Sequence, residues 1–236
     1  MRSPRISFAG GYYHVTTRCN NKEFLFKDDQ DFELYCKFIA KGKQKHGVKL
    51  YAYNLMHNHV HLLVHTPEKG NLSQFMHYVN GEFAKAYNRL HGRQGHFWGE
   101  RFYSTVFEVD SQYAKTTAYI ELNAVKAKMV KSPRDWKWSS YLAHAFGKYD
   151  SILDKHTSYL NVSDDDAVQQ KHHRQMIQHY MEENGLQFCP PISKGIIAGT
   201  KDFVNNLLEK IQNVHVFYKK RKAFHYSGDC FCLKRL

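Results

Sequence analysis

The stretch Leu55-Met56-His57-Asn58-His59-Val60-His61-Leu62-Leu63-Val64 decides how the rest of the chain is interpreted. Successive side chains of a β-strand point to opposite faces, so His59 and His61 share one face while the apolar residues between them enter a core. Two imidazoles at this spacing are half of a metal site, because neutral imidazole is a common metal ligand. The stretch therefore predicts a core strand that presents a histidine pair.

A second segment, residues 111–128, has the pattern of a helix and places Tyr119 and Asn123 four residues apart on one face. The amide oxygen of Asn123 is our candidate for the third metal ligand. Two imidazoles and one amide oxygen form a weak set of ligands that suits exchangeable Mg²⁺ or Mn²⁺ better than a structural zinc. Tyr119 is the candidate nucleophile, and Lys115 and Lys126 lie on roughly its side of the helix, where a cation would promote loss of the phenol proton. This combination predicts a nuclease that attacks with a tyrosine.

The composition supports a nucleic-acid partner. The chain has 236 residues, 42% of them hydrophobic, and a formal net charge of +12, which favours a polyanion as partner. Its five cysteines are an odd number in a chain too large to need disulfides, so we expect reduced thiols. No apolar run reaches the roughly 20 residues that span a bilayer, and no signal peptide follows the first residues. We expect a cytoplasmic protein without a membrane segment.

The order of the expected elements predicts an α+β fold. Residues 12–18, 49–55, 59–66 and 102–109 are expected strands, and residues 28–46, 73–91 and 111–128 are expected helices. Strand, helix, strand, strand, helix, strand is the ferredoxin-like pattern of an antiparallel sheet with packed helices. We divide the chain into a catalytic domain, residues 1–145, and a basic helical C-terminal extension of unknown role, residues 146–236.

Four segments resemble the HUH tyrosine transposases of the single-tyrosine class, especially the branch associated with REP sequences. They occur in the family's order and are Gly11-Tyr12-Tyr13-His14-Val15-Thr16, Met56-His57-Asn58-His59-Val60-His61-Leu62-Leu63, Gly95-His96-Phe97-Trp98-Gly99-Glu100-Arg101-Phe102 and Tyr119-Ile120-Glu121-Leu122-Asn123-Ala124-Val125-Lys126-Ala127. The resemblance implies that His59 and His61 are the metal-binding pair, Tyr119 the nucleophile and Asn123 the polar third ligand. It also implies a divalent metal and a single-stranded or hairpin DNA substrate, cleaved to a 5′-phosphotyrosine and a free 3′ hydroxyl. The chain departs from the family at His57 and at Ala124, where Pro and Asn-Pro are usual.

Several side chains are candidates for holding DNA phosphates. They are Arg18, Arg101, Lys115, Lys126 and the tail residues Lys219, Lys220, Arg221 and Lys222. We predict a site-specific single-strand DNA endonuclease and strand transferase, monomeric or homodimeric. One alternative is a domesticated regulator that binds hairpin DNA without cleaving it, and another is a metal-dependent hydrolase that uses activated water. His14 and His96 could reach the site from neighbouring elements, although a structural role is the more common one for such residues.

Overall fold

The computed structural model describes residues 5–68, 71–184, 192, 195–214, 222–227 and 230–234. Its strands are β1 (Gly11–Arg18), β2 (Lys49–Met56), β3 (His59–Thr66), β4 (Tyr103–Phe107), β5 (Gly195–Gly199), β6 (Phe224–Ser227) and β7 (Cys230–Lys234). Its helices are α1 (Asp29–His46), α2 (Leu72–Leu90), α3 (Val109–Glu121), α4 (Asn123–Lys126), α5 (Tyr141–Phe146), α6 (Thr157–Leu160), α7 (Asp166–Asn184) and α8 (Lys201–Val214), with short 3₁₀ turns at Asn20–Lys22 and Pro133–Asp135.

The seven strands form one sheet in the order β2-β3-β1-β4-β5-β7-β6. The first four strands have the ferredoxin-like order, and β1 pairs antiparallel with both β3 and β4. β4 and β5 are parallel, and every other pairing in the sheet is antiparallel. The predicted α+β class is confirmed.

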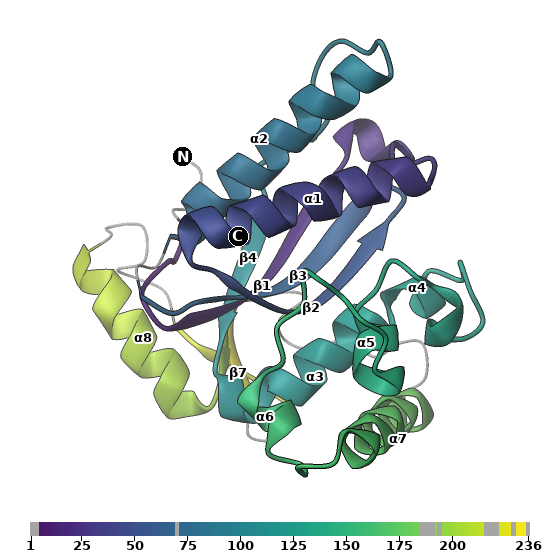
Figure 1. The fold of residues 1–236 in the computed structure, drawn as a ribbon. Helices are drawn as coiled ribbons and strands as arrows, with labels where there is room; N and C mark the ends of the chain where they lie inside the picture. The colour runs from purple at the N-terminus through teal and green to yellow at the C-terminus, as the bar shows by residue number, and fades with distance from the viewer. Residues whose placement is uncertain are drawn as a thin grey trace.

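The side chains of β3 alternate between the two faces of the sheet, as predicted, so the histidines and Val60, Leu62 and Val64 lie on opposite faces. Val60, Leu62 and Val64 are fully buried and pack with α1 and α2, which lie together on one face of the sheet (Figure 1). The other face carries His59 and His61 and is covered by α3 (Figure 1). The register pairs His61 with Thr16 and His59 with Arg18, which brings one end of β1 to the histidine pair.

Local signals explain the bounds of α1. The side chain of Asp28 accepts a hydrogen bond from the backbone N–H of Asp31, which satisfies one of the free donors at the helix start. Gly47 ends the helix with φ +61°, a left-handed conformation that favours glycine.

The C-terminal part contains strands as well as the expected helices. Beyond residue 145, α6, α7 and α8 are joined by β5, β6 and β7, and β5 extends the sheet beside β4. The division at residue 145 stays a prediction, although β5 shares the sheet of the first 145 residues. In the described part of the chain, no helix has the length and apolar character that crossing a membrane requires.

Candidate active site

A cleft of about 800 Å³ opens at the ends of β1 and β3, on the α3 face of the sheet. His59, His61 and Tyr119 all line it, so the structure brings the predicted histidine pair and the predicted nucleophile together. His14, Thr16, Thr17, Arg18, Cys19, Asn20, Asn21, Lys22, Gly99, Glu100, Arg101 and Tyr103 complete the lining.

Hydrogen bonds decide which ring nitrogen of His59 and of His61 carries the proton. Nδ1 of His59 lies 2.6 Å from the side-chain oxygen of Asn58, which can only accept, so Nδ1 carries the proton of His59. Nδ1 of His14 lies 3.4 Å from the carbonyl oxygen of Ile192 and donates to it, which leaves Nε2 of His14 as an acceptor. Nδ1 of His61, 2.9 Å from that Nε2, is therefore the donor. Both histidines of the pair keep Nε2 as a lone pair, as a metal ligand requires.

Burial keeps the pair neutral. Desolvation, followed by the charge of Arg18, lowers the pKa of His59 from 6.5 to about 4. Desolvation also holds the pKa of His61 well below its usual value, and His59 and His14 add to the shift. Both rings are thus uncharged at neutral pH, and the donor set fits a divalent cation.

Tyr119 faces these rings from α3. Its ring meets those of His14 and His61 edge to face, with centroid distances of 5.5 and 5.8 Å. The ammonium group of Lys126 lies 4.4 Å from the centre of the Tyr119 ring, which confirms that the two residues are close. Lys115 is exposed on α3 and is not part of the lining of the cleft.

The helix that carries Tyr119 ends earlier than we expected. The single helix predicted over residues 111–128 is split at Leu122 into α3 and α4. The buried amide of Asn54, on β2, donates to the carbonyl oxygens of Ile120 and Glu121, which would otherwise accept bonds from the next turn. Asn123 begins α4 and is buried, and its amide nitrogen donates to the carbonyl oxygen of Tyr119 at 2.6 Å. Its role as a metal ligand stays a prediction.

Cations surround the cleft and continue beyond it. Arg18 and Arg101 line the cleft and are exposed. Arg101 also lines a second groove of about 480 Å³ along α2, together with Arg5 and Lys85. Burial, followed by the like charge of Arg101, lowers the pKa of Arg5. Among the predicted basic residues of the tail, Lys222 is exposed, and Lys219, Lys220 and Arg221 lie outside the described residues.

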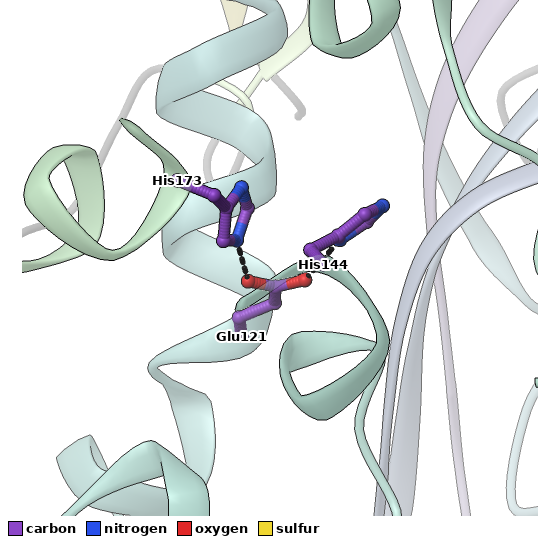
Figure 2. Close-up of side chains that lie close together, drawn as sticks. All are labelled: Glu121, His144 and His173. Carbon is purple, nitrogen blue, oxygen red and sulfur yellow. Dashed lines mark hydrogen bonds and ion pairs between the residues drawn. The ribbon is translucent and has the colours of Figure 1, made fainter. Parts of the chain in front are cut away.

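Another cluster of titratable side chains lies outside the cleft and was not predicted from the sequence. Glu121, His144 and His173 come from α3, α5 and α7 and meet in the interior (Figure 2). Their ligand atoms lie within 4.8 Å of one another, which is close enough to hold a metal ion. The three residues are far apart in the sequence and match no spacing rule, so only the fold reveals them.

Comparisons with known proteins relate one segment and the fold of this chain to transposases. Residues 7–123 match the family model described as "Transposase IS200 like". A search of curated proteins found no match. A solved REP-associated tyrosine transposase bound to a REP hairpin aligns with a TM-score of 0.54 and 21% identity, over 66% of this chain and 92% of the other. A putative transposase from Deinococcus radiodurans R1 aligns with a TM-score of 0.36 and 20% identity, over 51% of this chain and 96% of the other. The segment that matches the IS200-like transposase family, residues 7–123, is just under half of the chain and includes the histidine pair and Tyr119.

Proposed function

We propose that this protein cleaves one strand of folded DNA with Tyr119 and transfers the strand end through a covalent intermediate. The observation that carries the proposal is that Tyr119 and the neutral pair His59 and His61 line one cleft. The match of residues 7–123 to a transposase family supports the same reaction class. The energy of the broken ester is kept in the phosphotyrosine, so the strand can be rejoined without a nucleotide cofactor.

In the proposed reaction the phenol oxygen of Tyr119 attacks the phosphorus of a phosphodiester. The bond from phosphorus to the 3′ oxygen breaks, the phenol loses its proton, and the departing 3′ oxygen gains one. The product is a 5′-phosphotyrosine and a free 3′ hydroxyl. The ammonium group of Lys126, 4.4 Å from the ring centre, stabilises negative charge that develops on the phenol oxygen during attack.

Nε2 of His59, Nε2 of His61 and the amide oxygen of Asn123 are the atoms that we propose hold a divalent cation, Mg²⁺ or Mn²⁺. Such a cation neutralises charge on the phosphate oxygens. The hydrogen bonds at both Nδ1 atoms support this assignment, because they orient the two lone pairs.

The proposed substrate is single-stranded DNA with a hairpin. The solved relative is bound to a REP hairpin, and we infer a similar partner here. Arg5 and Arg101 are close enough to repel each other, which favours a phosphate between or beside them. The groove along α2 adjoins the cleft through Glu100 and Arg101 and offers a path for the flanking strand. A DNA substrate favours the cytoplasm as the compartment.

The test is an adduct assay with labelled hairpin DNA and Mn²⁺. The wild-type protein is expected to give a protein–DNA adduct that survives denaturation, and Tyr119→Phe is expected to give none. Tyr113→Phe is the matched control, because Tyr113 lies on the same helix but is buried in the core beside Ile120. An undiminished adduct from Tyr119→Phe refutes the nucleophile, cleavage without an adduct indicates a hydrolase, and binding without cleavage indicates a regulator.

A further inference from the structure

Glu121 joins three helices at a single buried carboxylate. Its side chain has no exposed surface, and those of His144 and His173 are 1% and 5% exposed. Nδ1 of His144 donates to Oε1 and Nε2 of His173 donates to Oε2, each at 2.7 Å. The hydroxyl of Ser140 also donates to Oε1, at 2.6 Å. Figure 2 shows the two rings approaching the carboxylate from different sides.

This arrangement is that of an ionised, hydrogen-bonded carboxylate. Burial alone would raise the pKa of Glu121, but His173 and His144 outweigh it and hold the pKa well below its usual range. Each ring nitrogen donates to a different oxygen of the carboxylate, and the Ser140 hydroxyl is a third donor. A buried carboxylate that accepts three charge-assisted hydrogen bonds is a strong and directional junction.

The junction lies next to the proposed nucleophile. Glu121 is the last residue of α3, two residues after Tyr119. An apolar contact continues the attachment, because Ile177 of α7 packs with Ala118 and Leu122 on either side of Tyr119. Met176, Tyr180 and Met181 of α7 belong to the same cluster, and so does Tyr119 itself.

We propose that Glu121, His144 and His173 are positioning residues for Tyr119, an inference that rests on the proposed function. The triad anchors the end of α3 to α5 and α7 and so sets the distance from the phenol to the histidine pair. The family match ends at residue 123, whereas His144 and His173 lie beyond it. The C-terminal part of the chain thereby gains a role in the reaction, since α7 forms the support against which the nucleophile is held.

The test compares His173→Leu, His173→Gln and the control His172→Leu in single-turnover adduct formation with hairpin DNA at saturating Mn²⁺. His172 is the exposed neighbour of His173 on α7. A shift of the nucleophile by about 1 Å costs on the order of 100-fold in rate. His173→Leu is therefore expected to slow adduct formation roughly 10- to 100-fold while the Kd for DNA is unchanged. His173→Gln, which keeps an N–H donor, is expected to recover most of the rate, and His172→Leu is expected to match the wild type.

If the triad only supported the fold, His173→Leu would weaken DNA binding and slow adduct formation together. His173→Gln would then not restore the adduct rate separately from DNA binding. If His173→Leu does not fold, Ile177→Val decides, because it loosens the adjoining apolar attachment of α7 to α3 without leaving a buried charge unpaired. A rate for His173→Leu, or for Ile177→Val in its place, that equals the His172→Leu rate overturns the inference. A metal measurement can also overturn it. The refuting result is one metal ion per chain that stays bound when both His59 and His61 are replaced and is lost in Glu121→Gln. Absence of any adduct from the wild type refutes the proposed function instead.

Discussion

Replacing His14 with leucine tests whether a residue outside the predicted ligand set controls metal binding. His14 is 3% exposed, and its Nε2 accepts from Nδ1 of His61 at 2.9 Å. Without that acceptor, the buried N–H of His61 loses a partner, which costs about 1–3 kcal/mol. The ring avoids this cost by moving its proton to Nε2, which removes the lone pair that we assign to the metal. Metal binding must then return the proton of His61 to Nδ1 at this same cost. At 1.4 kcal/mol per tenfold, the cost weakens metal affinity by about 5- to 150-fold.

The assay is direct Mn²⁺ titration, by calorimetry or by the loss of the free-ion electron paramagnetic resonance signal. We expect a roughly 10- to 100-fold higher Kd for Mn²⁺ in His14→Leu, in line with other losses of a ligand's hydrogen-bond partner. His14→Gln keeps an acceptor oxygen and is expected to recover part of the affinity. His65→Leu is the matched control, because His65 lies on β3, the strand that carries His61, and stacks on Tyr12. Unchanged Mn²⁺ affinity in His14→Leu would refute the chain of hydrogen bonds from Ile192 to His61.

Three further predictions follow from burial, packing and charge. The free energy of unfolding should fall as the pH drops from about 6.5 to about 4, because the folded state keeps His59 unprotonated to about pH 4 while the unfolded chain protonates it near 6.5. Chemical denaturation at several pH values should show that the free energy of unfolding changes less with pH in His59→Gln than in the wild type. Gly81→Ala should stabilise α2 by about 0.5–1 kcal/mol, since a Cβ there meets open space, whereas Gly42→Ala should destabilise, because its Cβ would lie 2.8 Å from the Val79 side chain; equal shifts in thermal midpoint would contradict this packing. Arg101→Ala should weaken hairpin binding and reduce the slope of log Kd against log salt by about 1, and an unchanged slope would remove Arg101 from the phosphate contacts.

The parts of the fold that sequence reasoning could predict are those with strong periodicity. β3 has the predicted bounds, because the alternation of its histidines with Val60, Leu62 and Val64 is a strong local strand signal. α1 follows its capping residues, with Asp28 and Gly47 at the predicted ends. The strands β5, β6 and β7 were not predicted, because they are only four or five residues long.

The candidate site likewise contains residues that could be predicted from the sequence and contacts that could not. Strand geometry relates His59 to His61, and the family resemblance assigns Tyr119 to the same site; all three line one cleft. The contact between His14 and His61 depends on the pairing of β1 with β3, and the triad at Glu121 depends on the packing of α3, α5 and α7. The split of α3 from α4 also has a tertiary cause, since Asn54 reaches the helix end from β2. Contacts of this kind leave no local signal in the chain.

Peptide mapping of the covalent product tests the central claim most directly. The wild-type protein would react with hairpin DNA and Mn²⁺, and nuclease and protease digestion followed by mass spectrometry would locate the residue that carries the nucleotide. Our account predicts a 5′-linked nucleotide on Tyr119. A nucleotide on any other residue, or a linkage through the 3′ end of the strand, would contradict it.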